Sequence, residues 1–118
     1  MPELPEVENV KRSLQRQGLL GQTLTEILLR RSNLRTPLHP FLVEKLPGQT
    51  VRRLSRRAKF LLIDTDDYVL LSHLGMSGSW RFLSPSEELR AHDHVVIKLS
   101  AGKILVYNDP RRFGLLEL

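Results

Sequence analysis

The sequence of 118 residues contains no cysteine and no long apolar run. Without thiols, these residues can form neither a disulfide nor a thiolate-ligated zinc site. No apolar stretch approaches the roughly 18 residues that a membrane-spanning helix needs. The N-terminus also lacks the basic and apolar regions of a secretory signal. These absences favour a cytoplasmic protein without a membrane partner, and we expect no metal or other cofactor in this chain.

Positive charge, in contrast, is plentiful and uneven. The net charge is +5, and five basic side chains lie within eight residues: Arg52, Arg53, Arg56, Arg57 and Lys59. Clustered charge of this kind indicates a polyanion partner such as nucleic acid. A solvated strand face would explain the same cluster, so composition alone leaves both interpretations open.

Hydrophobic spacing predicts one leading helix. Val7, Val10 and Leu14 recur at helical intervals within residues 4–17. Acidic side chains gather at the start of this segment and basic ones at its end, which complements the helix dipole. This electrostatic effect is a sufficient explanation for Glu8.

After Gly21 the pattern changes to short runs rich in Ile, Val, Leu and Phe, separated by turn residues. These runs predict strands at 24–31, 51–65, 68–74, 79–83, 94–100 and 103–108, with a short helix at 40–46. Hairpin-type connections at 64–68 and 100–103 indicate mostly antiparallel pairing. We therefore predict one domain of the α+β class, mainly β, over residues 1–118. Its N-terminal helix would pack on a two-sheet antiparallel β-sandwich or flattened barrel.

The last residues, FGLLEL, contain three leucines and no turn, cap or polar tail. Such an end needs cover from a segment absent here or from a second copy of the chain. We therefore expect a fragment that self-associates through an exposed C-terminal edge.

The N-terminus offers a nucleophile. Removal of Met1, which is usual before a residue as small as proline, would give Pro2 a free secondary amine with a pKa near neutrality. Condensed with an aldehyde, this amine gives a cationic iminium, which withdraws electrons from the neighbouring carbons. That chemistry suits the opened sugar of an abasic nucleotide, and Glu3 and Glu6 are near enough in sequence to exchange protons with it. Many chains begin Met-Pro by chance, so the spacing alone does not establish a catalytic amine.

Lys59 is the unusual member of the basic cluster. Strand alternation in AKFLLID places it on the same face as Leu61 and Ile63. A lysine on an apolar face either extends to the rim of the sheet or serves a site. The pattern leaves both explanations open.

Two segments have the composition of loops that read DNA. HLGMSG (73–78) sets Met76 between two glycines, and DPRRFG (109–114) presents Arg111 and Phe113 after a proline. Enzymes that extrude a base fill the resulting hole with Met, Phe or Arg side chains. Met76 and Phe113 could equally be core residues beside tight turns.

Five motifs, in this order and spacing, resemble the N-terminal domain of bacterial formamidopyrimidine-DNA glycosylase: PELPEVE, RRAKFLL, HLGMSG, HDHV and NDPRRFG. The resemblance spans the chain from Pro2 to Phe113 and beyond. Leu4 favours this family over its sister, endonuclease VIII, which typically reads PEGPE there. The resemblance implies base excision repair in the bacterial cytoplasm. It implies hydrolysis of the N-glycosidic bond of oxidised purines (formamidopyrimidine, 8-oxoguanine) in double-stranded DNA, then cleavage of the abasic site by β/δ-elimination.

The resemblance also implies a role for each matched position. Pro2 would be the Schiff-base nucleophile, Glu3 the acid/base that helps to open the sugar, and Glu6 a supporting carboxylate. Lys59 would donate a proton and contact a phosphate. The DNA-binding residues would be His92, Arg111, Met76, Phe113, His73 and Asn108, with His94 as a further support. Among these, Met76, Arg111 and Phe113 would occupy the void left by the extruded base.

Family members are more than twice this long and continue into a helix-two-turn-helix element and a four-cysteine zinc finger, which these residues lack. The family's zinc therefore cannot be assigned to this chain. We expect weak DNA binding, weak or no activity in base excision, and a monomeric parent protein. The alternatives are a non-catalytic DNA-binding fragment and an N-terminal-proline tautomerase, which would begin a β-strand rather than a helix at its proline.

Overall fold

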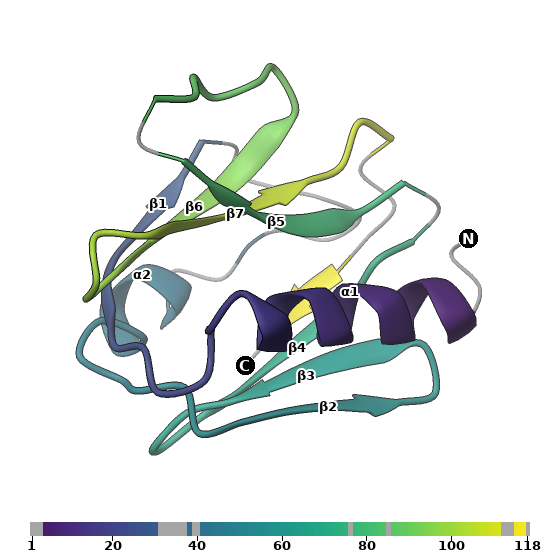
Figure 1. Ribbon diagram of the computed structural model, residues 1–118, viewed down its shortest axis with the longest axis horizontal. Helices are drawn as coiled ribbons and strands as arrows, with labels where there is room; N and C mark the ends of the chain where they lie inside the picture. The colour runs from purple at the N-terminus through teal and green to yellow at the C-terminus, as the bar shows by residue number, and fades with distance from the viewer. Residues whose placement is uncertain are drawn as a thin grey trace.

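The computed structural model describes residues 4–30, 38, 41–75, 77–84, 86–111 and 115–117. Within them the chain forms a leading helix and two four-stranded antiparallel sheets (Figure 1). The helices are α1 (Leu4–Arg16) and α2 (Phe41–Lys45). The strands are β1 (Leu24–Leu29), β2 (Arg53–Arg57), β3 (Phe60–Asp64), β4 (Val69–His73), β5 (Ser79–Leu83), β6 (Asp93–Leu99), β7 (Ile104–Asn108) and β8 (Leu115–Glu117). The predicted α+β sandwich is confirmed.

The first sheet has the strand order β1-β6-β7-β5 and the second has the order β2-β3-β4-β8. Helix α1 contacts β5 at the edge of the first sheet, and β2 and β3 in the second. Figure 1 shows it lying between the two sheets. The helix thus covers one open side of the sandwich, and α2 packs against β1, the opposite edge of the first sheet.

The apolar stripe of α1 is buried as its spacing predicts. Val7 and Leu14 are almost fully buried, and the next apolar residue, Leu19, joins the same core. The helix ends at Arg16, one residue before the predicted boundary. Gly18 follows with φ of +89°, a backbone conformation that glycine adopts without steric cost and that commonly ends a helix.

The run 51–65, predicted as one strand, is a hairpin. Strands β2 and β3 pair from Arg57↔Phe60 outward, with only Ala58 and Lys59 between them. The prediction was wrong because this turn contains no glycine, proline or asparagine; Ala58 itself takes φ of +52°.

A second correction concerns the C-terminal residues. Leu115–Glu117 form strand β8, which pairs with β4 through His73↔Leu115 and Leu71↔Glu117. No sequence signal predicted this strand, because its three residues are too few for an alternating pattern. Since β8 is an edge of its sheet, its backbone can accept another strand, but self-association stays a prediction.

The core fills the space between the sheets and beneath α1. At its centre, Trp80 packs against Tyr107 with ring centres 5.0 Å apart, and its indole N–H donates to Ser72 Oγ at 2.9 Å. Both buried polar groups of this contact are therefore satisfied. Neither helix described by the structure has the length and hydrophobicity required to cross a membrane.

Candidate active site and nucleic-acid interface

Strand pairing brings several chain segments to one end of the sandwich. In the first sheet, Asn108 at the end of β7 pairs with Ser79 at the start of β5 and with Asp93 at the start of β6. In the second sheet, His73 at the end of β4 pairs with Phe60 at the start of β3. We call this region the loop end: the start of α1, the β2–β3 turn, the β4–β5 loop, the start of β6 and the loop after β7. Figure 1 shows the start of α1, the β2–β3 turn and the loop after β7 on its right-hand side.

The loop end contains the described members of the predicted site. Glu6, Lys59, His92 and Arg111 are exposed, whereas His73 and Asn108 are half-buried at the ends of their strands. The other predicted residues, Pro2, Glu3, Met76 and Phe113, lie outside the described residues. The roles given to all ten stay predictions.

Glu8 links α1 to the second sheet. One carboxylate oxygen, Oε1, accepts a hydrogen bond from Arg56 Nε of β2 at 3.2 Å. The other oxygen lies 3.1 Å from Lys11 Nζ and 3.0 Å from Arg12 Nε on the same helix. The hydrogen bonds from Lys11 and then Arg56 hold the pKa of Glu8 below its usual value. Helix-end electrostatics therefore explains only part of the role of Glu8.

The β2–β3 turn is attached to this ion pair. Arg56 Nη1 donates a hydrogen bond to the Ala58 carbonyl oxygen at 3.1 Å. Leu61 and Ile63 alternate on the buried face of β3 as predicted, but Lys59 precedes the strand and is exposed in the turn. The expected position of Lys59 on an apolar strand face is therefore wrong, and the lysine lies in a turn that Arg56 ties to α1.

His73 connects that turn to the β4–β5 loop. Its ring meets the Phe60 ring edge-on at a centroid distance of 5.1 Å. Its Nδ1 accepts a hydrogen bond from the Gly75 backbone N–H at 3.1 Å, which requires the proton of a neutral ring to be on Nε2. His73 thus helps to hold the backbone of the HLGMSG segment in place.

The two loops that resemble DNA-reading segments are joined by Ser77. Its hydroxyl donates to Asp109 Oδ1 at 2.7 Å and accepts from the Arg111 backbone N–H at 3.1 Å. Asp109 is fully buried, and its Oδ2 accepts from the Tyr107 hydroxyl at 3.0 Å. The β4–β5 loop also depends on Gly78: a Cβ there would lie 2.4 Å from both the Leu74 carbonyl oxygen and the Tyr107 hydroxyl.

A second buried carboxylate, Asp93, organises the start of β6. It accepts two hydrogen bonds from Arg81 at 2.7 and 2.8 Å, one from Asn108 at 2.8 Å and one from the Arg90 backbone N–H at 2.6 Å. Burial alone would raise the pKa of Asp93, but the bonds from Arg81, Arg90 and Asn108 outweigh it and hold the pKa well below its usual value. The side-chain amide of Asn108 is thus used within the protein.

The two histidines of HDHV differ in exposure. His94 is buried, and its Nε2 lies 2.9 Å from the Asp109 carbonyl oxygen; since a carbonyl can only accept, Nε2 is the donor. His92 is exposed, with its ring centre 6.1 Å from that of His94. His94 therefore braces the loop after β7, and His92 faces solvent.

Comparison with known proteins identifies the family. Residues 1–116 match the family model of the formamidopyrimidine-DNA glycosylase N-terminal domain. This chain belongs to that family. Curated relatives named formamidopyrimidine-DNA glycosylase include those of Stenotrophomonas maltophilia strain K279a, 52% identical over 98% of this chain, and Thioalkalivibrio sulfidiphilus, 48% identical over 97%. The chain spans less than half the length of these relatives, 43% and 42% respectively.

Solved structures of the family have the same fold. The Fpg protein of Lactococcus lactis in complex with DNA that contains an abasic site superposes with a TM-score of 0.88, at 36% identity, over 98% of this chain and 43% of that one. A complex between the LlFpg protein, a THF-DNA and an inhibitor also gives a TM-score of 0.88, at 37% identity, over 98% of this chain and 42% of that one. These matches confirm the family predicted from the five motifs.

Sequence reasoning missed the residues that hold the loop end together. In the sequence, Arg56 is one cation of the basic cluster, and Ser77 and Asp109 lie within the motifs HLGMSG and DPRRFG without a predicted role. Partnership across such distances in sequence has no periodic signal. The available signal was that a polar residue lies next in sequence to each predicted DNA-contacting residue.

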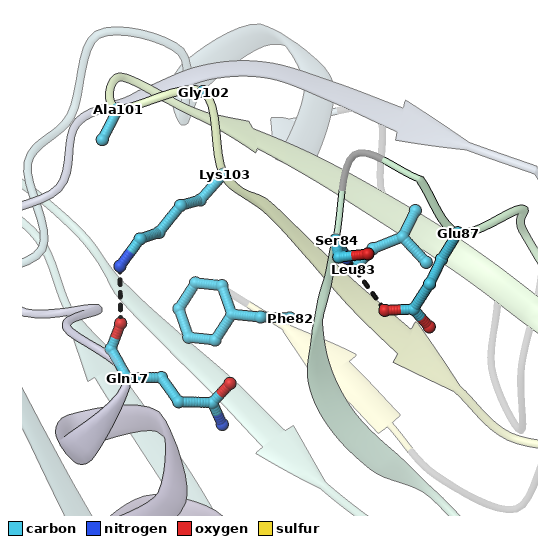
Figure 2. A pocket seen from close by; sticks show the side chains of 8 residues that line it. All are labelled: Gln17, Phe82, Leu83, Ser84, Glu87, Ala101, Gly102 and Lys103. Atoms are coloured by element: carbon cyan, nitrogen blue, oxygen red, sulfur yellow. Dashed lines mark hydrogen bonds between the residues drawn. The ribbon is translucent and has the colours of Figure 1, made fainter.

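A cavity of about 510 Å³ lies where β5 ends and β6 turns into β7, at the opposite end of the sandwich (Figure 2). Lys103 Nζ there donates to the Gln17 carbonyl oxygen at 2.8 Å and lies 5.5 Å from the centre of the Phe82 ring. Glu87 accepts from the Ser84 backbone N–H at 3.0 Å. Figure 2 shows both charged groups directed at backbone atoms beside the cavity: Lys103 ties the β6–β7 turn to the end of α1, and Glu87 completes a local turn with Ser84.

Among the described residues, no group of three or more His, Asp or Glu side chains is arranged to hold a metal ion.

Proposed function

We propose that this chain carries the nucleophile and the lesion-facing surface of a bifunctional DNA glycosylase and abasic-site lyase. Its substrates would be oxidised purines (formamidopyrimidine and 8-oxoguanine) in double-stranded DNA, and its pathway base excision repair. The observation that carries the proposal is the loop end. Strand pairing, the packing of α1 on both sheets and the Ser77 contact gather there the segments bearing Glu6, Lys59, His73 and Arg111. Relatives named as formamidopyrimidine-DNA glycosylases support it.

The reaction would proceed through the N-terminal amine. After loss of Met1, the Pro2 nitrogen attacks C1′ of the damaged nucleotide; the base leaves, or water leaves when the site is already abasic. Cleavage of the C1′–O4′ bond then opens the sugar to a cationic iminium, since the nitrogen of a secondary amine has no second proton to lose. Loss of the C2′ proton then expels the 3′-phosphate from C3′, with the iminium accepting the electron pair, which completes β-elimination.

The neighbouring groups would move the protons. Glu3 would protonate the sugar ring oxygen as the ring opens, and Glu6 would support that carboxyl. Lys59 would donate a proton and contact a phosphate. Its exposed position in the β2–β3 turn, which Arg56 links to α1, supports both roles. A cation at this position also stabilises the developing phosphate charge.

The rest of the loop end would hold the DNA. His92 and Arg111 are exposed and would contact it directly, and Met76, Arg111 and Phe113 would fill the void left by the extruded base. His73, which accepts a hydrogen bond from Gly75, and Asn108, which donates one to Asp93, would support the phosphate-binding wall. Arg111 is favourably placed because its backbone is fixed through Ser77.

The isolated chain would bind DNA weakly and with a steep dependence on salt, since phosphate contacts release counterions. Excision of 8-oxoguanine would be strongly reduced, because much of the relatives' length lies beyond this chain. Attack on an existing abasic site would be reduced less than excision, since no base must be held. Release of 8-oxoguanine by these 118 residues at the normal rate would contradict this difference between excision and attack on an abasic site.

The proposal is tested by reductive trapping. The chain is incubated with a duplex that contains one abasic site in the presence of borohydride, and its intact mass is measured. The expected result is a DNA-sized adduct on protein that has lost Met1, because hydride reduces the iminium to a stable amine. The matched control is the same chain with Met1 retained, which should give none.

No adduct on protein shown to lack Met1 would overturn the lyase role of this chain. DNA binding without an adduct would then favour the alternative, a non-catalytic DNA-binding fragment. The tautomerase alternative has less support, since the element that follows the first three residues is a helix.

A further inference from the structure

We propose that Arg56 is a positioning residue that sets Lys59 relative to the start of α1. The inference rests on the proposed function, because it assigns Lys59 to the reaction. Arg56 itself is not expected to touch the reacting atoms. It would act through the β2–β3 turn and Glu8.

Arg56 contacts both elements that carry the predicted catalytic groups. Its Nε donates to Glu8 Oε1 on α1 at 3.2 Å, and its Nη1 donates to the Ala58 carbonyl oxygen at 3.1 Å. That carbonyl belongs to the peptide unit leading into Lys59, and peptide units are rigid planes. One guanidinium therefore fixes the plane that precedes Lys59 and ties it to the helix.

The backbone of this turn is strained. Ala58, with φ of +52°, is the one non-glycine residue with positive φ in the part of the chain that the structure describes. It occupies the first position of a two-residue hairpin turn, where glycine is the usual residue if φ is positive. Such conformations persist where the surroundings hold them, and they gather at functional sites. The bond from Arg56 to Ala58 is a contact able to hold this one.

The guanidinium group suits this bridging role. Its donors are fixed in one plane, so Nε and Nη1 can serve two acceptors at once. A lysine presents a single ammonium on a flexible stem and cannot reproduce both contacts in the same geometry. The inference therefore predicts that Arg56→Lys rescues little of what Arg56→Met loses.

Glu8 would remain paired if Arg56 were removed. Lys11 and Arg12 both contact its second oxygen from α1 itself. Arg56 is also about one-third exposed, so its replacement leaves no buried charge. Replacement of Arg56 would therefore weaken the connection between α1 and the β2–β3 turn rather than impair folding.

The test compares Arg56→Met with the parent chain and with Lys98→Met. Lys98 is an exposed cation of β6 that pairs with Glu26 on β1, so its replacement matches the change in charge. The single-turnover rate constant for β-elimination, followed as cleavage of the abasic strand, is measured at saturating abasic duplex without borohydride, and the Kd is measured separately. We expect Arg56→Met to cleave the abasic strand about 10-fold or more slowly, because small displacements of reacting groups carry large kinetic costs. Lys98→Met should keep the parental rate.

A cycle with Lys59→Met separates positioning from general damage. If Arg56 acts through Lys59, the double variant should cleave the abasic strand no more slowly than Lys59→Met alone, since the two effects share one cause. Independent multiplication of the two losses would overturn the inference. So would a parental rate for Arg56→Met. Failure of the parent chain to form any adduct would instead overturn the proposed function, and this inference with it.

Discussion

Asp93 and Glu8 are both carboxylates that accept hydrogen bonds from arginine, yet the protein holds them differently. The Asp93 side chain has no exposed surface and accepts four hydrogen bonds from three residues. The Glu8 side chain is 23% exposed, and its partners are flexible cations in contact with solvent. Both carboxyls have a pKa below the usual value, but burial opposes ionisation strongly only at Asp93.

The difference indicates that the two clusters have different roles at the loop end. The Asp93 cluster fixes the first sheet, where β5, β6 and β7 meet, and cannot change without leaving polar groups buried. The Glu8 cluster connects a helix to a turn at the surface, where water can replace a lost partner. We therefore expect changes at Asp93 to act on stability, and changes at Glu8 to act on the reaction.

The largest effect on stability is expected for Asp93→Ala. The substitution removes the acceptor of Arg81 and Asn108 and leaves a partly buried guanidinium without its carboxylate. The free energy of unfolding should fall by roughly 3 kcal/mol or more, as is typical for breaking a buried pair. Urea unfolding measures it. A loss no larger than that of an exposed ion pair would remove the distinction between the clusters.

The next prediction distinguishes the two clusters by the effect of low pH on stability. The pKa of Asp93 is lower in the folded than in the unfolded chain, so its contribution is complete above the unfolded pKa of about 4. The contribution is lost as pH falls toward the folded pKa. Asp93→Asn should therefore show a shallower loss of stability than the parent between about pH 4 and pH 2, measured by urea midpoints. Equal slopes would contradict the assignment.

A smaller effect is expected at the turn beside Glu8. Ala58→Gly relieves the positive φ but gives the unfolded chain more freedom, and these effects oppose each other. The free energy of unfolding should change by less than about 1 kcal/mol. Thermal unfolding checks this. A larger loss would mean that the alanine methyl packs in a way its exposure does not suggest.

Glu8→Gln should have the smallest effect on stability. Its unfolding midpoint should match that of the parent within error, and about 1 M salt should remove any difference, because exposed pairs are screened. The same substitution should slow β-elimination at saturating DNA, measured as single-turnover cleavage of the abasic strand, since it weakens the link to Arg56. A destabilised Glu8→Gln chain with a parental rate of strand cleavage would contradict the roles proposed for the two clusters.

The fold could be predicted well where local pattern and burial agree. The strand predicted at 79–83 matches β5 to the residue, and the helix over 4–17 differs from α1 by one. The prediction failed where a turn lacked turn residues, at Ala58 and Lys59, and where the three residues of β8 were too few to show a period. In both cases pairing with another strand determined the local backbone, and propensity did not.

For the site, the sequence alone determined the chemical inventory: the motifs, the basic cluster and the family they indicate, because residue type and spacing are local properties. Tertiary structure alone decided which groups meet. Antiparallel register placed the ends of β4 and β7 beside the starts of β3, β5 and β6, and packing of α1 brought Glu8 to Arg56. Ser77 meets Asp109 across 32 positions of chain for the same reason. Such contacts arise from the burial of two apolar sheet faces and a helix stripe against one another, so no short stretch of sequence encodes them.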